Sequence, residues 1–430
     1  MGLFGTSGIR RLANRELIDL AFQVGLAVGN IYSNIVIGRD TRTSGSVLNH
    51  AVTTGVLAVG ARCTDVGVLP TPTLAFAARE FEAAIMITAS HNPPQYNGLK
   101  MLNPDGSAFS YEQQKQIEDL ISCSADIQTS WDKMQSEMVC THAIENHILR
   151  IMQDFPAGTG KGIKVVVDSG CGAAYFITPQ LLTRLGCQVI PLNCYPNGIF
   201  PHEIEPIEAN LKDLMRAVKE TGANLGIAHD GDADRMMVVD DLGRFISGDK
   251  LLAIFSQASG VKNIVTTIDA SMCIEEMGFV VRRTRVGDPY VSEELKKSGG
   301  FGGEPSGSWI FPLVSFCPDG IYAAAQIIAV ASRQKLSILA DSIPSYPVVR
   351  GNVSGISAAM GKIQQELMQG LKPVSIDTID GLKLIFKDGW LLVRPSGTEP
   401  KIRLTTESKS KDIAQGYYEK GKQIIAECVS

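Results

Sequence analysis

The sequence predicts an α/β protein of three related α/β units, followed by a smaller α+β domain at the C-terminus. The first observation is a repeated order of apolar strand, polar turn, helix and strand, which is typical of sheets with helical crossovers. The second is that three apolar strands each lead into a polar turn with an aspartate, at Asp40, Asp168 and Asp269. The third is the length of 430 residues, which corresponds to three or four domains.

The composition excludes several classes of protein. A hydrophobic fraction of 44% and a charged fraction of 20% are ordinary for a globular chain with a large core. The net charge of -5 gives no basis for binding nucleic acid. The nine cysteines contain no C-x-x-C pair, and no apolar stretch is long enough to span a bilayer. We therefore expect a cytoplasmic protein with reduced thiols and neither a nucleic-acid nor a membrane partner.

The first α/β unit is expected over residues 1–155. Its opening segment, FGTSGIR at residues 4–10, allows two interpretations: a flexible tail, or an anion site made of glycine amides, hydroxyls and a guanidinium. The apolar patterns that follow predict four helices and three strands. The helices are expected at 16–28, 46–59, 111–121 and 140–153, and the strands at 35–37, 66–69 and 83–87.

An active-site loop is expected at residues 88–100, TASHNPPQYNGLK, directly after the strand at 83–87. Two consecutive prolines remove two backbone donors and fix φ, so this segment cannot be the interior of a helix. The loop carries Ser90 and His91 at its start and Lys100 at its far end. α/β enzymes place their chemistry on polar loops at strand ends. An ordinary turn would explain the prolines but not the Ser-His pair.

The second α/β unit, expected over residues 156–250, contains a second chemical motif. After a strand at 163–167, the turn at 168–173 begins like a dinucleotide fingerprint, but Tyr175 occupies the third glycine position and the match fails. The sequence DGDADR at residues 230–235 lies between two apolar strands, at 225–228 and 236–239.

Three carboxylates of this motif, those of Asp230, Asp232 and Asp234, are expected to converge because alternate residues of a near-extended loop project to one side. Their repulsion calls for a cation, and ligation by oxygen alone suits Mg²⁺. A calcium EF-hand is excluded because Arg235 stands where glycine is needed and the flanks are strands. A solvated acidic turn disagrees with apolar strands on both sides.

The third α/β unit is expected over residues 251–342, with a strand at 264–268. It carries two polar loops, TRVGD at 284–288 with Gly287 and Asp288, and GGEPSGS at 302–308. Within the second loop, Glu304 and Ser306 pair an acceptor with a hydroxyl, a combination that can bind sugar hydroxyls. As isolated motifs, both loops also fit ordinary turns.

The fourth domain, expected over residues 343–430, contains short strands near 382–386 and 390–393 and the motif RPSGTEPKIR at 394–403. Hydroxyls, free amides and forked guanidinium groups in this motif are suited to a phosphate dianion. A structural turn with solvated arginines is the alternative. The candidate phosphate ligands are Arg394, Ser396, Gly397, Thr398 and Arg403.

Four motifs in order, TASHNP, DGDADR, GEPSG and RPSGTEPKIR, resemble those of the α-D-phosphohexomutases, and FGTSGIR and GRDTRTSG are also similar. The resemblance covers essentially the whole chain. It implies four domains around a central cleft, three of them related α/β units with mixed sheets. It also implies that Ser90 is a phosphoserine, and that Mg²⁺ is bound by Ser90, Asp230, Asp232 and Asp234.

In this family the phosphoserine donates its phosphoryl group to a sugar phosphate, and a hexose 1,6-bisphosphate serves as intermediate and activator. The resemblance implies assistance to proton transfer or phosphate charge from Lys100, His91, Arg10 and Arg235. It implies substrate binding by the polar loops of the third and fourth domains, through Gly287, Asp288, Glu304, Ser306, Arg394, Ser396, Gly397, Thr398 and Arg403. Motion of the fourth domain is expected because the intermediate must be retained.

Two positions depart from the family pattern: Ser308 stands where relatives often have histidine, and Arg11 stands where glycine is usual. The first departure leaves the general base unassigned. The sequence GEPSGSWIFP at 303–312 looks most like the phosphoglucosamine mutase branch, in its archaeal type, which implies conversion of glucosamine 6-phosphate to glucosamine 1-phosphate. The phosphoglucomutase/phosphomannomutase branch is the alternative.

Two other classes of function remain open on the sequence. A metal-dependent sugar phosphatase could use Ser90 and the three aspartates, with water intercepting the phosphoserine. A non-catalytic sugar-phosphate binding protein would not need both a nucleophile loop and a metal loop. The oligomeric state is expected to be a monomer or a homodimer.

Overall fold

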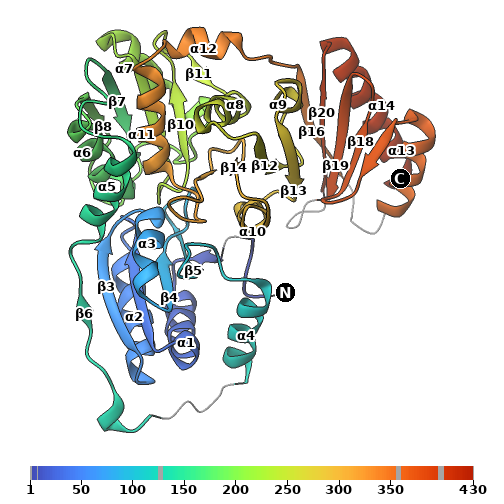
Figure 1. Cartoon of the computed structure of the whole chain (residues 1–430). Coiled ribbons are helices and arrows are strands. Elements are labelled where there is room, and N and C mark those ends of the chain that lie inside the picture. Colours follow the sequence, from blue (N-terminus) through green and yellow to red (C-terminus); the bar gives the residue numbers. More distant parts are fainter. Residues whose placement is uncertain (1, 7, 124–128, 355–359, 396–400, 430) are drawn as a thin grey trace. The chain divides into compact units, whose positions relative to one another are not determined.

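The computed structural model describes the chain except residues 1, 7, 124–128, 355–359, 396–400 and 430 (Figure 1). It divides into two compact units. The first unit comprises Met1–Val261 and Gly287–Asp341, and the second comprises Lys262–Val286 and Ser342–Ser430. The expected third domain therefore supplies residues to both units, and the four expected domain boundaries, like the central cleft, stay a prediction.

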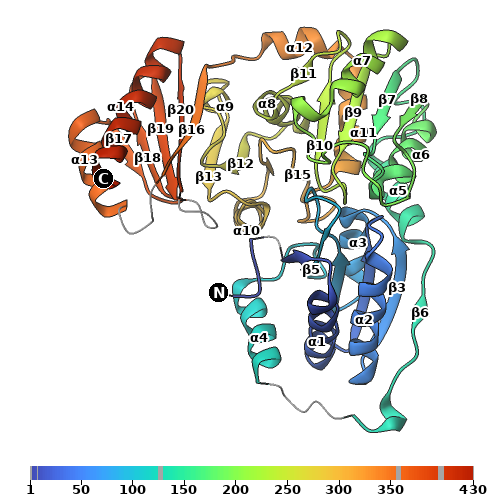
Figure 2. The same ribbon diagram turned by 180° about the vertical axis from the view of Figure 1, so that it is seen from behind.

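The first unit begins with a mixed six-stranded sheet (Figure 1, Figure 2). Its strands β4, β2, β3 and β6 pair in parallel, whereas β5 pairs antiparallel with both β4 and β1. The strand order is β1 (Ile9–Leu12), β5 (Tyr96–Leu102), β4 (Ala83–Ile87), β2 (Asn34–Arg39), β3 (Arg62–Val68), β6 (Met138–Val139). The helices of this part are α1 (Arg15–Ile31), α2 (Gly45–Ala58), α3 (Thr71–Ala77), α4 (Tyr111–Ser122) and α5 (Ala143–Asp154).

Alternation along the central strand β2 explains why both faces of this sheet are covered. Ile35 and Ile37 belong to the apolar cluster formed with α1 and α2, whereas Val36 belongs to a second cluster with Leu74 of α3. Successive side chains of a strand point to opposite faces, so an apolar run of this kind requires helices on both sides.

Four details differ from the sequence-based expectations. The strand expected at 66–69 is part of β3, which begins at Arg62, and the helix expected at 140–153 begins only at Ala143. The flexible-tail interpretation of residues 4–10 is wrong at Ile9 and Arg10, because these residues lie in β1 and pair with β5. Lys100 does not lie at the far end of a loop, because the loop ends at Gln95 and Lys100 is inside β5. The polar Asn97 and Lys100 concealed the strand, although both are buried.

A second mixed sheet follows in the first unit, and it carries the aspartate-rich motif on a hairpin. Its strand order is β11 (Phe245–Ile246), β10 (Met236–Val239), β9 (Leu225–His229), β7 (Lys164–Asp168), β8 (Gln188–Leu192). β9 and β10 are antiparallel and pair His229 with Met236, so residues 230–235 form the connection between them. The accompanying helices are α6 (Ile177–Arg184), α7 (Lys212–Thr221), α8 (Gly248–Ser259) and α11 (Gly320–Ala331).

The rest of the first unit contains a short antiparallel pair and two more helices. These elements are β14 (Phe301–Gly303), β15 (Trp309–Ile310), α10 (Asp288–Ser298) and α12 (Leu336–Ser342). Among the described residues, none of the helices combines the length and apolar character that a membrane span requires. All nine cysteines are free thiols, as expected from their spacing.

The second unit contains an antiparallel sheet with two helices on one face, which agrees with the expected α+β domain. The strand order is β16 (Val348–Ser354), β20 (Lys401–Ser408), β19 (Gly389–Pro395), β18 (Leu382–Ile385), β17 (Ser375–Asp377). α13 (Met360–Leu371) and α14 (Lys411–Val429) enclose an apolar core with the sheet residues Leu384, Leu391, Val393, Ile402 and Leu404. The same unit includes the parallel pair β12 (Asn263–Thr267) and β13 (Val280–Thr284), and α9 (Cys273–Glu276).

The aspartate at the end of β7 fixes the loops at that edge of the sheet. Asp168 Oδ1 accepts hydrogen bonds from the Gly170 amide at 2.9 Å and from Asn193 Nδ2 at 3.0 Å. Its Oδ2 lies 3.3 Å from His202 Nε2, while His202 Nδ1 lies 2.8 Å from the Glu203 carbonyl oxygen. Since a carbonyl and a carboxylate only accept, both ring nitrogens donate, and the hydrogen bond to Asp168 raises the pKa of His202 despite the opposing effect of burial.

We expect His202→Asn to destabilise the protein mainly at acid pH. A raised pKa in the folded state means that the stabilisation is fully present below the unfolded value of about 6.5 and is lost as pH rises through the folded value. The expected loss of unfolding free energy is about 1 kcal/mol at pH 5.5, allowing for screening of a partly exposed ring. Urea unfolding at pH 5.5 and 8.5 measures it, with the exposed His50→Asn as control. An equal loss at both pH values would contradict this assignment.

Candidate active site

Ser90 occupies a strained and buried position directly after β4. Its φ of 51° lies in the left-handed region, and its side chain is 1% exposed. The Ser90 amide donates to Thr88 Oγ1 at 2.9 Å, and Thr88 Oγ1 donates to Asp40 Oδ2 at 2.6 Å. A non-glycine residue in this conformation costs about 1–2 kcal/mol, so the surrounding contacts must stabilise it.

The guanidinium of Arg42 contributes to that stabilisation. Arg42 is 1% exposed and donates to three main-chain carbonyls of the serine loop (residues 88–95), at 2.8 Å to Ser90, 2.6 Å to Asn92 and 2.8 Å to Pro93. It also donates at 2.9 Å to the carbonyl of Tyr96, the first residue of β5. Its Nε also donates to Asp40 Oδ2 at 3.1 Å. The segment GRDTRTSG therefore forms the support of the serine loop, a role that its sequence alone did not reveal.

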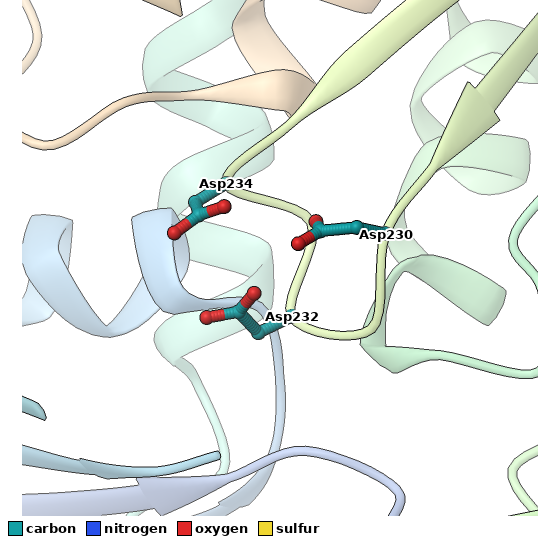
Figure 3. A group of neighbouring side chains, drawn as sticks. All are labelled: Asp230, Asp232 and Asp234. Carbon is teal, nitrogen blue, oxygen red and sulfur yellow. The ribbon is translucent and has the colours of Figure 1, made fainter. Parts of the chain in front are cut away.

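The three aspartates converge on a common space, as expected, but not through an extended loop (Figure 3). Ala233 has a φ of 57°, so the segment turns between β9 and β10. One carboxylate oxygen from each of Asp230, Asp232 and Asp234 lies within 4.8 Å of the others, and all three residues are buried. Burial excludes the solvated acidic turn.

The serine loop is in direct contact with the aspartate loop, residues 230–235, although Ser90 and Asp230 are 140 residues apart in the sequence. The Ser90 hydroxyl donates to Asp230 Oδ2 at 2.7 Å. A Cβ placed on Gly231 would lie 2.5 Å from the Ser90 carbonyl oxygen, so only glycine permits this approach. The structure thus joins the two strongest motifs of the sequence in one site.

Lys100 partly neutralises the aspartate group. Its Nζ lies 2.6 Å from both Asp232 Oδ2 and Asp234 Oδ2. Burial opposes the ammonium charge, but these carboxylates outweigh it and raise the pKa of Lys100. Burial and the two neighbouring carboxylates raise the pKa of Asp230 well above its usual value. Lys100 thus neutralises part of the negative charge of the three aspartates, and the charge of Arg235 acts on Asp230 and Asp234 as well.

The donor set fits a divalent cation bound through oxygen. Asp232 Oδ1 and Asp234 Oδ1 are buried and have no hydrogen-bond partner among the described residues. Unpartnered buried carboxylate oxygens are costly unless a metal or an ordered ligand contacts them. With Asp230 from the same loop, they offer the carboxylate ligands that Mg²⁺ favours.

The remaining cationic and imidazole groups of the prediction lie around the same serine. His91 Nδ1 is 3.3 Å from Ser90 Oγ, and Arg10 Nη1 donates to Asn92 Oδ1 at 2.9 Å. Burial, followed by the charges of Arg235 and Arg10, lowers the pKa of His91 to about 3, so its ring is neutral at physiological pH. The Arg235 amide donates to Asp230 Oδ1 at 3.2 Å, which attaches this arginine to the aspartate loop.

The GEPSG loop lies against the aspartate loop. The main chain of Ser308 bridges to Arg235, and the Met236 amide donates to the Gly307 carbonyl oxygen at 3.0 Å. Glu304 Oε1 accepts the Gly287 amide at 2.8 Å, which connects the two polar loops of the predicted third domain.

The side chains of these loops differ in their exposure. Ser306 is exposed, whereas Ser308, at the position where relatives often carry histidine, is 3% exposed. Asp288 lines a small cavity of about 30 Å³ beside Lys100 and Asp234. The structure therefore brings Asp288 and Glu304 close to the aspartate loop.

In the second unit, two arginines of RPSGTEPKIR lie directly opposite each other on adjacent strands. Arg394 on β19 pairs in register with Arg403 on β20, and Arg394 Nη2 lies 2.7 Å from Asp380 Oδ2. Like charges directly opposite each other are destabilising, and Asp380 offsets the charge of Arg394 only, so binding of an anion by this pair stays a prediction. The predicted ligands Ser396, Gly397 and Thr398 lie outside the described residues.

A third arginine belongs to the same face. Arg350, Arg394 and Arg403 line a hollow of about 390 Å³, together with Asn352 and Asp269. Register places Asn352 opposite Arg403, and Arg350 opposite Thr405, so the arginines occupy three adjacent strands. The sequence analysis missed Arg350 because it stands alone in an ordinary strand pattern, far from the motif.

Comparison with known proteins gives a consistent result over the whole chain. Four models of phosphoglucomutase/phosphomannomutase match, for alpha/beta/alpha domains I, II and III at residues 1–126, 144–243 and 247–346, and for the C-terminal domain at 349–420. The chain is 47% identical to "Probable phosphoglucosamine mutase" of Methanocella arvoryzae, over 100% of this chain and 99% of that protein.

Two further similarities support this result. The chain is 44% identical to "Probable phosphoglucosamine mutase" of Methanosarcina acetivorans, over 100% of both chains. A crystal structure of a phosphoglucomutase/phosphomannomutase family protein from Burkholderia thailandensis superimposes with a TM-score of 0.89 and 27% identity, over 99% of this chain and 97% of that one.

We expect Arg42→Lys to release the serine loop. A single ammonium cannot donate to four carbonyls, and losing these buried bonds is expected to cost about 3 kcal/mol of unfolding free energy. Hydrogen exchange of peptides covering residues 88–97 should accelerate more than that of α1 or α14. Arg15→Lys, at an exposed position of α1, is the control. Unchanged exchange in the serine loop would show that Arg42 does not support it.

Proposed function

Because the chain belongs to the phosphoglucomutase/phosphomannomutase family, the α-D-phosphohexomutases, we propose that it interconverts glucosamine 6-phosphate and glucosamine 1-phosphate. Four family models along the chain support the reaction, and two relatives named "Probable phosphoglucosamine mutase" support the sugar. The observation that carries the proposal is the 2.7 Å hydrogen bond between Ser90 Oγ and Asp230 Oδ2, because it joins the proposed nucleophile to one of the proposed metal ligands.

The proposed reaction transfers a phosphoryl group twice. In the first transfer, the bond between phosphorus and Ser90 Oγ breaks as the free hydroxyl oxygen of the sugar phosphate bonds to phosphorus, and the hydroxyl proton leaves. The product is a hexose 1,6-bisphosphate. In the second transfer, Ser90 Oγ attacks the other phosphate and the isomeric monophosphate is released. No net phosphate is consumed. A trace of the bisphosphate serves as activator because it can phosphorylate a Ser90 that has lost its phosphoryl group.

The residues around Ser90 have distinct proposed roles. Asp230, Asp232, Asp234 and the phosphorylated Ser90 would hold Mg²⁺, and the bound ion would supply positive charge to the transferring phosphoryl group. Lys100, Arg10 and Arg235 add charge from side chains. Lys100 remains protonated beside its carboxylates, so it acts through charge, whereas His91 is neutral and can accept a hydrogen bond.

Substrate contacts are proposed on both units. Glu304 and Ser306 bind sugar hydroxyls. Gly287 and Asp288, in the neighbouring loop at 284–288, also contact the substrate. Arg394 and Arg403 bind the phosphate that does not react, with Ser396, Gly397 and Thr398 as further ligands. The facing pair Arg394–Arg403 supports this assignment because an anion between the two side chains relieves their repulsion.

A cytoplasmic location is part of the proposal, on the evidence of nine free cysteines and a metabolic phosphosugar substrate. Whether the enzyme is a monomer or a homodimer stays a prediction.

The substrate is tested by comparing kcat/KM for glucosamine 6-phosphate, glucose 1-phosphate and mannose 1-phosphate, with Mg²⁺ and a trace of hexose 1,6-bisphosphate. We expect a preference for the amino sugar of about tenfold or more, because a few polar contacts decide such discrimination. Equal or better use of neutral hexoses would make the protein a phosphoglucomutase/phosphomannomutase. Release of inorganic phosphate without isomer formation would indicate a sugar phosphatase, and binding without either product would indicate a binding protein.

We expect Ser90→Ala to lower mutase turnover at least about a thousandfold, because the atom that carries the phosphoryl group is removed. The melting temperature should stay near that of the wild type. Mg²⁺ binding should survive through the three unchanged aspartates, without the ligand that phosphorylated Ser90 would supply. Ser345→Ala, at an exposed position of the second unit, is the matched control. Normal turnover by folded Ser90→Ala protein would overturn the phosphoserine mechanism.

A further inference from the structure

The two carboxylate oxygens of Asp232 have different surroundings. Oδ2 accepts hydrogen bonds from Thr71 Oγ1 at 2.5 Å and from Lys100 Nζ at 2.6 Å. Oδ1 is buried and, within the described part of the chain, has no partner. One oxygen is therefore saturated by protein donors, and the other is left for a ligand.

Thr71 is held rigidly enough to impose this difference. It is 2% exposed at the start of α3 and stands between Pro70 and Pro72, which restrict the backbone on both sides. Its amide also donates to the Asp232 carbonyl oxygen at 2.9 Å. Thr71 thus contacts both the main chain and the side chain of one residue in the aspartate loop.

Lys100 alone cannot fix the orientation of Asp232. Its ammonium is shared with Asp234 Oδ2, at the same distance of 2.6 Å. The last torsion of an aspartate side chain has a broad and roughly two-fold energy profile, so rotation would present either oxygen to a single cationic partner. A second donor of fixed direction is needed to keep one particular oxygen unpaired.

We propose that Thr71 is a positioning residue, whose hydroxyl holds Asp232 Oδ2 so that Oδ1 remains available to bind the divalent cation. The inference rests on the proposed function, which requires that cation. Partners of metal-binding carboxylates commonly determine ligand orientation, and their removal typically weakens metal binding 10- to 100-fold. Thr71 would act through Asp232 and not by touching substrate.

The test titrates Mg²⁺ into the full-length protein by isothermal calorimetry. Thr71→Val keeps the shape of the side chain and removes the hydroxyl, and we expect it to weaken Mg²⁺ binding by about tenfold or more. Thr71→Ser keeps the hydroxyl and should bind Mg²⁺ within about threefold of the wild type.

The matched control is Thr73→Val. Thr73 lies on the same helix, is fully buried, and forms one side-chain hydrogen bond, between Oγ1 and His147 Nδ1 at 3.0 Å. The control loses a comparable hydrogen bond, so its melting temperature should fall as much as that of Thr71→Val, while its Mg²⁺ affinity should stay within about twofold.

The outcomes separate this proposal from the proposed function. Tight binding by the wild type together with unchanged affinity in folded Thr71→Val protein would overturn the role of Thr71 and leave the mutase proposal standing. Equal weakening by Thr71→Val and Thr73→Val would also overturn it, because general loosening of α3 would explain both. A wild type that does not bind Mg²⁺ would overturn the metal role in the proposed function, and the role of Thr71 with it.

Discussion

Repulsion among three buried carboxylates is the interaction on which the first unit depends. Asp230, Asp232 and Asp234 place their oxygens within 4.8 Å in a region shielded from water, where like charges interact strongly. Lys100 of β5 offsets part of this repulsion, and hydroxyl groups of the serine loop and of α3 donate hydrogen bonds to the carboxylates. Among the described residues, two carboxylate oxygens still have no hydrogen-bond partner, Oδ1 of Asp232 and Oδ1 of Asp234. The same arrangement therefore ties two sheets together and creates the demand for a cation.

The precision of this arrangement requires unfavourable backbone geometry at several points. Ser90 and Ala233 both adopt left-handed conformations, and Gly231 lies too close to the Ser90 carbonyl to carry a side chain. Strain of this kind persists only where surrounding contacts overdetermine it. Arg42 provides such contacts through four carbonyls, among them that of Ser90 itself, which explains why a guanidinium is buried there.

The second unit also brings like charges together, but here the charges are positive. One face of its sheet packs on α13 and α14, and the other presents Arg350, Arg394 and Arg403 on adjacent strands. Clustered guanidinium groups on one sheet face are unfavourable without an anion. One unit thus assembles carboxylates suited to a cation, and the other assembles arginines suited to phosphate.

The sequence alone determined the α/β strands, the serine loop and the aspartate motif, because these signals are local: apolar alternation, consecutive prolines and carboxylates two residues apart. It could not place Lys100 inside a strand, since the polar Asn97 and Lys100 hide the pattern of β5. Nor could it identify Arg42, Thr71 or Arg350, whose local patterns are ordinary and whose roles depend on distant partners. Only the tertiary structure decided that Ser90 meets Asp230 across 140 residues, because contacts between remote segments follow from the packing of sheets and helices and not from neighbouring residues.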